Sequence, residues 1–308
     1  MGVEEEDGRL CDARYIRALL ARHGFHFSRA RGQNFLTADW VPRAIVRHAG
    51  LDGTQDVFEV GPGLGALTRP LARAARRVVA AEVDTSLRPV LAETLTGLDN
   101  VDVLWADVLT LDLPALVAAH FPGRRPVVCA NLPYAVTTPV LTRLLGSGLF
   151  EALTVMVQKE VAQRLCAAPG TPAYGAFSIY VGVHACPAIA FDVPPDAFLP
   201  RPRVTSSVVH MVCRKRPLRH EALFFRLVRA AFGQRRKTLL NALAPALPLP
   251  KDALSALIAS CGLAPSARGE TLGIPEFETL SAAAARAVSG PAAAEDANIP
   301  GGNTHKKN

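Results

Sequence analysis

Short apolar runs alternate with segments of helical periodicity through the first half of the chain. The runs at 56–60, 77–82, 101–105 and 126–130 are rich in Val and Ala and predict buried strands. The segments between them, such as 66–75, repeat apolar residues at the three- to four-residue spacing of a helix that buries one face. This alternation predicts an α/β fold with a parallel sheet.

The pattern changes in the second half. Residues 188–192 and 207–212 have strand character and are joined by the proline-rich stretch 194–202, which predicts an antiparallel pair at the end of the sheet. Beyond residue 217 helical periodicity takes over and predicts a small all-helical domain. Its expected helices cover 221–232, 237–244, 252–261 and 274–288.

These patterns divide the chain. We expect a leader at 1–11, a catalytic domain at 12–213, a helical domain at 217–287 and a disordered tail at 288–308. With 308 residues and 49% hydrophobic content, the chain can bury a full core. It shows no signal peptide and no apolar run of membrane length, so we expect a cytoplasmic protein without a membrane partner.

A glycine-rich turn follows the first predicted strand. Gly61, Gly63 and Gly65 lie between the strand at 56–60 and the helical segment that follows. Glycines let a ligand approach the backbone, and the start of the following helix offers free N–H groups. The spacing also satisfies the dinucleotide-binding pattern G-x-G-x-x-A, which ends at Ala66. The turn alone therefore predicts a nucleotide-containing cofactor and does not distinguish a dinucleotide from another nucleoside derivative.

Three polar residues follow later strands of the predicted sheet. Glu82 ends the second strand, Asp107 comes shortly after the third, and Asn131 follows the fourth. Each acid alone could be a helix cap or a surface residue. At one edge of an open α/β sheet, however, Glu82 can accept both hydroxyls of a ribose and Asp107 can accept an adenine amino group. No group of residues suggests a nicotinamide site, which argues against hydride transfer.

The tetrapeptide at 131–134, Asn-Leu-Pro-Tyr, suits a planar exocyclic amine. The amine of a purine attacks a methyl group only if acceptors help its nitrogen to pyramidalise, and Asn131 Oδ1 with the carbonyl of Leu132 or Pro133 can supply them. Proline stiffens the loop. Tyr134 can stack on the base, an interaction worth roughly 1–3 kcal/mol. The predicted acceptor is N6 of adenine.

Together these residues resemble S-adenosylmethionine-dependent amino-methyltransferases with a Rossmann-like fold. Three further segments resemble the rRNA adenine N6,N6-dimethyltransferases: 31–36 (RGQNFL), 198–207 (FLPRPRVTSS) and 232–241 (FGQRRKTLLN). The last of these resembles the bacterial small-subunit branch, the KsgA type. The resemblance covers residues 13–285 and implies S-adenosyl-L-methionine as the cofactor.

The resemblance also implies roles for single residues. Asn34 and Leu36 would contact the cofactor through their backbone, and Phe198 would sandwich the base opposite Tyr134. A lone phenylalanine is more often a core residue, but the prolines around Phe198 predict a rigid exposed loop and favour the stacking role.

The implied activity is dimethylation of N6 on a pair of adjacent adenosines near the 3′ end of 16S rRNA, within precursors of the small ribosomal subunit. The enzyme would act in ribosome biogenesis and as a monomer. One alternative is the related 23S rRNA methyltransferase type that confers macrolide resistance. The other is a non-catalytic assembly or transcription factor that retains the fold.

The charge distribution agrees with an RNA partner. The chain carries a formal charge of +7, and residues 214–237 hold nine Lys and Arg against one acid. A solvated helix face would show the same charges. Their place beside the predicted base pocket favours contacts with phosphates. The RNA-binding candidates are Arg214, Lys215, Arg216, Arg235, Arg236 and Lys237.

The cysteines predict neither a metal site nor disulfides. The six are scattered, with no C-x-x-C pair and no histidine at metal-ligand spacing. Cys129 lies next to the tetrapeptide, but a cysteine in a buried strand behaves as a small apolar residue, so we do not expect it to be a nucleophile.

Overall fold

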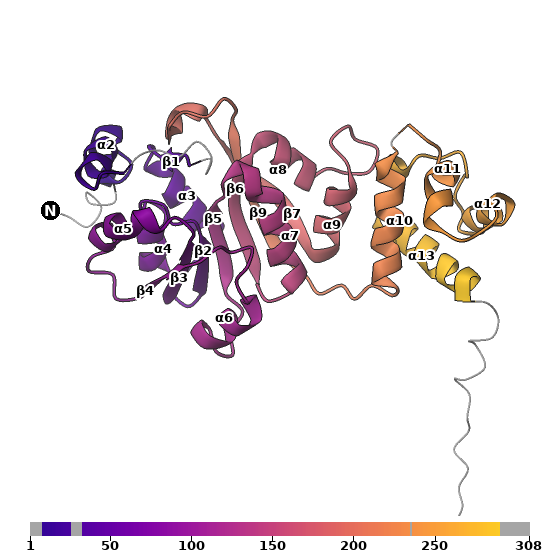
Figure 1. Ribbon diagram of the computed structural model, residues 1–308, viewed down its shortest axis with the longest axis horizontal. Coiled ribbons are helices and arrows are strands. Elements are labelled where there is room, and N and C mark those ends of the chain that lie inside the picture. The colour runs from indigo at the N-terminus through magenta and orange to yellow at the C-terminus, as the bar shows by residue number, and fades with distance from the viewer. Residues whose placement is uncertain (1–7, 26–32, 235, 290–308) are drawn as a thin grey trace, which may run out of the picture. The chain divides into compact units, whose positions relative to one another are not determined.

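The computed structural model describes residues 8–25, 33–234 and 236–289. The chain divides into two compact units, Met1–Ala167 with Tyr180–Arg216 and Ala168–Ile179 with Pro217–Asn308 (Figure 1). Residues 168–179 fall within the sequence range expected for the first domain but pack in the second unit.

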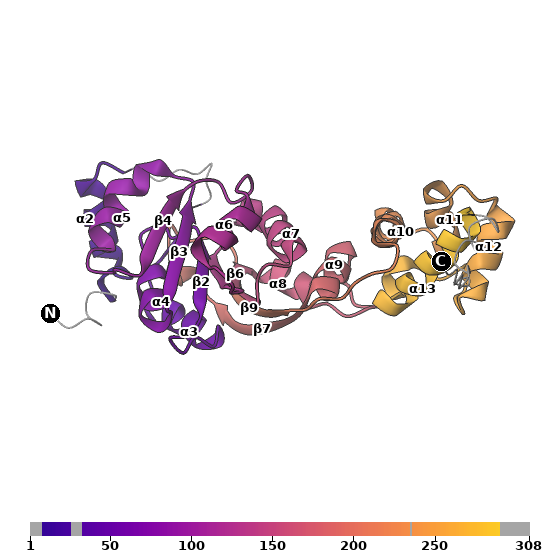
Figure 2. The ribbon, with the colours of Figure 1, turned by 90° about the horizontal axis from the view of Figure 1, so that it is seen from below.

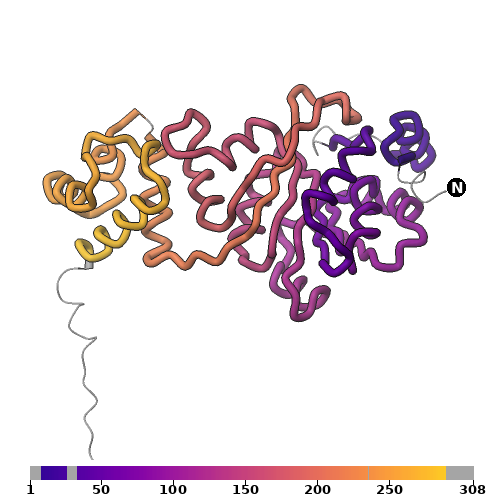
Figure 3. The backbone as a smooth tube through the Cα atoms, turned by 180° about the vertical axis from the view of Figure 1, so that it is seen from behind, coloured from indigo at the N-terminus to yellow at the C-terminus, as the bar shows by residue number. Residues whose placement is uncertain are grey.

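A seven-stranded sheet forms the centre of the first unit, in the order β4-β3-β2-β5-β6-β9-β7. The first five of these strands are parallel, and β9 runs antiparallel to both β6 and β7. The strands span Asp56–Val60 (β2), Arg77–Glu82 (β3), Val101–Trp105 (β4), Val127–Asn131 (β5), Ala152–Gln158 (β6), Ala185–Val193 (β7) and Ser206–Cys213 (β9). The predicted α/β class and the antiparallel pair at the sheet's end, visible in Figure 3, are confirmed.

Helices cover both faces of this sheet, with α3 and α4 on one side and α6 and α7 on the other (Figure 2). The helices of the unit are α2 (Ala13–Arg22), α3 (Trp40–His48), α4 (Thr68–Ala74), α5 (Arg88–Thr94), α6 (Leu113–His120), α7 (Thr137–Ser147), α8 (Lys159–Leu165) and the end of α9 (Ala176–His184). Short 3₁₀ helices are η2 (Thr85–Leu87), η3 (Tyr134–Val136) and η4 (Pro195–Ala197).

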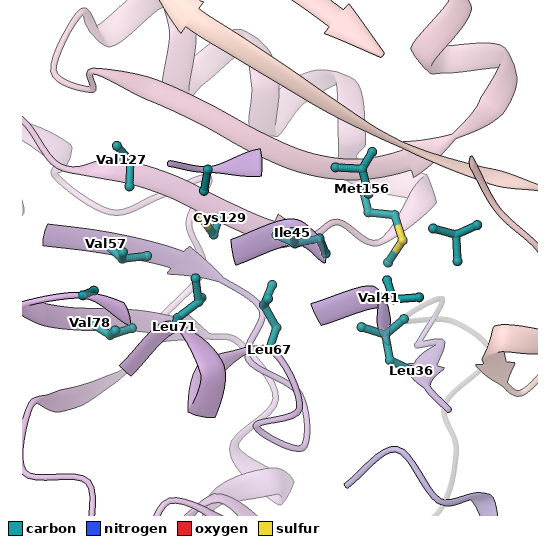
Figure 4. Close-up of a cluster of buried hydrophobic side chains, with 14 of the residues drawn as sticks. Leu36, Val41, Ile45, Val57, Leu67, Leu71, Val78, Val127, Cys129 and Met156 are labelled. Atoms are coloured by element: carbon teal, nitrogen blue, oxygen red, sulfur yellow. The ribbon is translucent and has the colours of Figure 1, made fainter. Parts of the chain in front are cut away.

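A cluster of buried side chains joins the sheet to α3 and α4 (Figure 4). Val57 and Cys129 from the strands meet Ile45 of α3 and Leu71 of α4, and all four are fully buried. Burying one aliphatic side chain of this size stabilises a fold by about 1.5–3 kcal/mol. Burial also raises the pKa of the Cys129 thiol, so it stays protonated and apolar, as the sequence predicted.

A small two-stranded ribbon was not predicted. β1 (Phe35–Leu36) pairs antiparallel with β8 (Phe198–Leu199). Phe198 is therefore only 4% exposed and packs in the same cluster as Leu36. The prediction of an exposed loop is wrong at Phe198, because its flanking prolines border a strand that finds a partner. The residues around Phe198 are exposed on both sides, at Pro194 and Asp196 before it and at Pro200, Arg201 and Arg203 after it.

The second unit is helical. It contains α10 (Glu221–Gly233), α11 (Leu239–Leu243), α12 (Lys251–Ser260) and α13 (Ile274–Ser289), with the 3₁₀ helices η5 (Ala244–Ala246) and η6 (Gly269–Thr271). The predicted helices are confirmed, and each end differs by two residues at most. Phe224 and Phe277 are fully buried between α10 and α13.

Residues 168–179 pack on these helices. The hydroxyl of Tyr174 donates to the carbonyl of Leu272 at 2.9 Å, and its ring meets Phe232 edge-on. Burial raises the pKa of Tyr174 to about 12. Among the helices of the described residues, none is long and apolar enough to cross a membrane.

Candidate active site

A cavity of about 310 Å³ opens in the first unit where the parallel strands end. This volume lies at the lower end of the range typical of sites for small molecules. Its wall contains most of the residues that the sequence singled out: Asn34, Leu36, Gly61, Gly63, Glu82, Asp107, Asn131, Leu132, Pro133 and Tyr134. Gly65 and Phe198 do not line it.

The glycine turn has backbone angles that only glycine adopts easily. Gly63 has φ +58°, and a Cβ there would lie 3.3 Å from the ring of Phe35 in the cavity wall. Gly65 has φ +87°, and a Cβ there would lie 3.0 Å from Leu95. Gly63 thus keeps the cavity open, whereas Gly65 lets the turn pack against the end of α5.

Glu82 is held rigidly at the end of β3. Its Oε2 accepts the N–H of Gly63 at 3.3 Å, and its Oε1 accepts the N–H of Asp84 at 2.8 Å. The residue is 6% exposed, and burial raises its pKa, although these N–H donors oppose the change. A carboxylate oxygen has two lone pairs, so each can accept a further bond from a ligand hydroxyl.

The sequence analysis missed Asp84, which lies beside Glu82, and quoted its partner Gln33 only within the segment 31–36, without a role. Asp84 is 1% exposed and accepts bonds from the N–H of Ser86 at 3.1 Å and from Gln33 Nε2 at 2.8 Å. Asp84 thereby caps η2 and ties the end of β3 to the segment before β1. The local Asp-x-Ser pattern signals the cap, but the bond to Gln33 has no local signal.

Asp107 lies on the same wall, after β4. Its Oδ1 accepts the N–H of Leu109 at 2.8 Å, which closes a turn and orients the carboxylate. The sequence placed Glu82, Asp107 and Asn131 at one edge of the sheet, and the structure brings all three to one cavity.

Asn131 faces the cavity with a fixed amide. Its Nδ2 donates to the carbonyl of Asn34 at 3.1 Å. A carbonyl can only accept, so the amino group must face Asn34, and Oδ1 keeps its capacity to accept from a ligand. No local pattern in the sequence predicts this contact with Asn34.

The structure distinguishes the two main-chain carbonyls of the tetrapeptide. The carbonyl of Pro133 already accepts from Val136 N and Thr137 Oγ1, both at 3.1 Å. The carbonyl of Leu132 accepts no hydrogen bond from any described residue. It is therefore the acceptor that can act beside Asn131 Oδ1.

Tyr134 begins η3 and contributes to the cavity wall. Its hydroxyl lies 2.7 Å from Ser206 Oγ at the start of β9. Burial raises the pKa of Tyr134, so the phenol is neutral near pH 7. The sequence analysis singled out the tyrosine and quoted Ser206 only within the segment 198–207, without a role of its own.

The predicted RNA-binding residues are divided between the units. Arg214 and Lys215 are exposed after β9 in the first unit, with Arg216 half-buried beside them. Arg236 and Lys237 are exposed in the second unit, and Arg235 lies outside the described residues. Over residues 8–25, 33–234 and 236–289 no group of three or more His, Cys, Asp or Glu could hold a metal ion.

Comparison with known proteins decides the family. Residues 24–275 match the family model for ribosomal RNA adenine dimethylase. The chain belongs to this family. Two relatives, each named ribosomal RNA small subunit methyltransferase A, come from Latilactobacillus sakei subsp. sakei strain 23K and Geobacillus thermodenitrificans strain NG80-2. Both are 44% identical to this chain over 86% of its length, which covers 92% and 93% of theirs.

Solved structures show the same fold. A dimethyladenosine transferase from Plasmodium falciparum superposes with a TM-score of 0.68 at 22% identity, covering 80% of this chain and 95% of that one. The 23S rRNA methyltransferase ErmE gives a TM-score of 0.62 at 24% identity and covers 82% and 100%. At such identities these likenesses concern the fold alone.

Family membership confirms several predictions from the sequence. The protein is an rRNA adenine dimethyltransferase with a Rossmann-like methyltransferase domain, and its cofactor is S-adenosyl-L-methionine. The site fits that cofactor, since Gly63 leaves room for close approach and Glu82 presents a buried carboxylate to the same cavity. The roles of the single residues remain predictions.

Proposed function

We propose that this protein dimethylates N6 of a pair of adjacent adenosines near the 3′ end of 16S rRNA, in precursors of the small ribosomal subunit. The relatives named for the small subunit and the segment 232–241 support that substrate. The chemistry rests on one observation: the bond from Asn131 to the Asn34 carbonyl, which leaves an oriented acceptor in the cavity.

One end of the cavity would hold the cofactor. Glu82 would accept the ribose hydroxyls, Asp107 the adenine amino group, and the backbone of Asn34 and Leu36 would make further contacts. S-adenosylmethionine supplies an electrophilic methyl group when it is bound. The protein's part is to orient it toward Asn131.

The tetrapeptide would hold the amine that is methylated. In the first transfer, Asn131 Oδ1 and the Leu132 carbonyl would accept hydrogen bonds from the two N–H groups of adenine N6, which turns the nitrogen lone pair out of conjugation and toward the methyl group. In the second transfer, the one N–H that remains on the methylated amine would bond to one of these acceptors. Both acceptors are fixed beforehand, Asn131 by Asn34 and Leu132 by the bond from its N–H to Met156 at 3.2 Å. The proton released from the amine passes to solvent.

Two aromatic residues were predicted to clamp the base. Tyr134 lines the cavity and would stack on one face. Phe198 is packed in the core, so covering the other face would require its side chain to leave the cluster around Leu36. Its part in the clamp is therefore a proposal that depends on movement of the β1–β8 ribbon.

We assign RNA contact to the basic residues at 214–216 and 235–237 and to the helical region 217–287, and catalysis to the region 12–213. The exposed side chains of Arg214, Lys215, Arg236 and Lys237 support phosphate binding. We further propose that the protein acts as a monomer in the cytoplasm.

The test is incubation of the purified protein with labelled S-adenosylmethionine and either unmethylated small-subunit particles or unmethylated large-subunit rRNA. We expect N6,N6-dimethyladenosine near the 3′ end of the small-subunit RNA alone. Label confined to large-subunit RNA would assign the protein to the macrolide-resistance type, and label in neither would favour a binding protein.

A further inference from the structure

Tyr134 and Ser206 are joined by a hydrogen bond that links the cavity wall to β9, the strand next to the β7 edge of the sheet. The phenol oxygen lies 2.7 Å from Ser206 Oγ, and the residues are 72 positions apart. Ser206 is fully buried, although it directly follows an exposed loop that carries Arg203 and Val204.

Ser206 is held rigidly at this position. It is the first residue of β9 and is paired on one side with Gln158 of β6 and on the other with Val193 of β7. The carbonyl of the preceding Thr205 accepts the N–H of Lys159 at 3.0 Å.

The next residue adds a second anchor. Ser207 Oγ donates to Asp192 Oδ1 at 2.6 Å, and Lys159 Nζ holds the other oxygen of Asp192 at the same distance. Lys159 and Ser207 lower the pKa of Asp192, so this anchor stays ionised near neutral pH. The start of β9 is thus tied to both neighbouring strands.

Tyr134 has less support of its own. It begins a three-residue 3₁₀ helix with no side-chain cap, and its side chain is half-buried in the cavity wall. A tyrosine side chain turns about two bonds. A hydrogen bond at the hydroxyl, the far end of the ring, fixes the direction of the ring axis and leaves the ring face available for stacking.

We propose that Ser206 is a positioning residue for the target base, because it fixes the ring of Tyr134 on which the adenine stacks. Tyr134 follows Asn131 by three residues, so the place of its ring sets how far N6 lies from Asn131 Oδ1 and the Leu132 carbonyl. The inference rests on the proposed role of Tyr134 as the stacking platform. It adds a residue that touches neither the cofactor nor the base.

The test is a double-mutant cycle on the hydrogen bond. Ser206→Ala and Tyr134→Phe each remove one hydroxyl of the hydrogen bond, and both keep the aromatic ring at position 134. Each should lower kcat/KM for the rRNA by roughly 3- to 10-fold, the effect of removing one hydrogen bond. The affinity for S-adenosylmethionine, measured by calorimetry, should stay unchanged. The double variant should lose no more than either single one.

Ser207→Ala is the matched control. It removes a fully buried hydroxyl from the next position of the same strand, but that hydroxyl bonds to Asp192 and not to Tyr134. We expect lower thermal stability and a clearly smaller loss of kcat/KM than in Ser206→Ala, because the pairing of Ser206 with Gln158 and Val193 remains. A loss equal to that of Ser206→Ala would mean that any weakening of β9 slows the reaction, and would overturn the proposal.

Two other results would also overturn it: losses that simply add in the double variant, or unchanged kinetics in Tyr134→Phe. The latter variant tests the bond even if Ser206→Ala fails to fold. The cycle is measured on whichever rRNA the wild type methylates. Failure of the small-subunit assignment would therefore appear as a change of substrate, and failure of the present proposal as a loss of coupling.

Discussion

The amide of Asn131 and the carbonyl of Asn34 lie 3.1 Å apart, although 97 residues separate them in the chain. Because the carbonyl accepts, the amide has one orientation, with Oδ1 available in the cavity. The segment before β1 therefore does more than line the cavity. It sets the direction of the acceptor on which the proposed chemistry depends.

Removal of this acceptor should slow transfer without loss of cofactor. Asn131→Ala should lower the single-turnover rate by about 10²- to 10³-fold, as removal of one preorganised polar group does in other enzymes. Asn131→Asp should also be slow, because its second oxygen would repel the Asn34 carbonyl. Binding of S-adenosylmethionine, followed by calorimetry, should change little.

The matched control for this prediction is Asn100→Asp. Asn100 also donates from Nδ2 to main-chain carbonyls, those of Ala72 at 2.7 Å and Ala75 at 3.2 Å, but it does not line the cavity. It should lose stability and keep its transfer rate. An Asn131→Ala variant with full rate would remove Asn131 from the catalytic role.

Substitution of Glu82 should weaken cofactor binding. Glu82→Gln keeps the shape but loses the charge, and loss of a charged hydrogen bond costs about 1.5–3 kcal/mol, or roughly 10- to 100-fold in affinity. Glu82→Ala should lose more. Asp102→Asn serves as the control, since that carboxylate pairs with Arg77 outside the cavity. Equal affinities in all four proteins would contradict the assignment of Glu82.

The affinity should also depend on pH. Burial raises the pKa of Glu82, so in the free protein it takes up a proton at higher pH than an ordinary glutamate. The protonated acid loses an acceptor, and affinity for S-adenosylmethionine should fall as pH is lowered. Glu82→Gln should lack this part of the dependence.

The sheet could be predicted because its strands carry local signals. Each of β2 to β5 is a short apolar run, and Glu82 and Asn131 end such runs. Parallel strands end at the same edge, so the chemistry at their ends could be placed together before the structure was known.

The contacts that complete the site are not local. β1 and β8 are two residues long, and their pairing joins positions more than 150 residues apart, which no periodicity can reveal. Phe198 is buried for that reason. The bonds from Asn131 to Asn34 and from Tyr134 to Ser206 likewise depend on tertiary packing, and the choice between the Leu132 and Pro133 carbonyls depends on a turn that only the folded chain shows.

Charge reversal in the helical unit should weaken RNA binding. Arg236→Glu with Lys237→Glu should reduce affinity for rRNA, and the slope of log K against log salt should become shallower by about one for each phosphate that the protein no longer neutralises. Filter binding over a series of salt concentrations measures both quantities. Lys251→Glu, another exposed lysine of this unit, is the control. If the wild type, the double variant and Lys251→Glu all show the same slope, Arg236 and Lys237 do not contact phosphates.

The last prediction concerns Glu59, an acid buried in β2. Glu59 is 1% exposed, and neither carboxylate oxygen has a hydrogen-bond partner among the described residues. Burial raises its pKa to about 8, and the charge of Glu82 adds to this. The folded protein therefore keeps a proton on Glu59 under conditions in which the unfolded chain has lost it.

Stability should consequently fall as pH rises from the ordinary value of 4.5 to about 8. In this window the native state binds more protons than the unfolded state, so each pH unit costs up to about 1.4 kcal/mol of unfolding free energy. The amide of Glu59→Gln does not titrate, so the variant should lack this dependence of the unfolding free energy on pH. Above pH 8 it should be more stable than the wild type. Urea unfolding below, within and above the window measures the effect, with the exposed Glu151→Gln as control. Parallel curves for the wild type and Glu59→Gln would show that Glu59 is ionised in the folded protein.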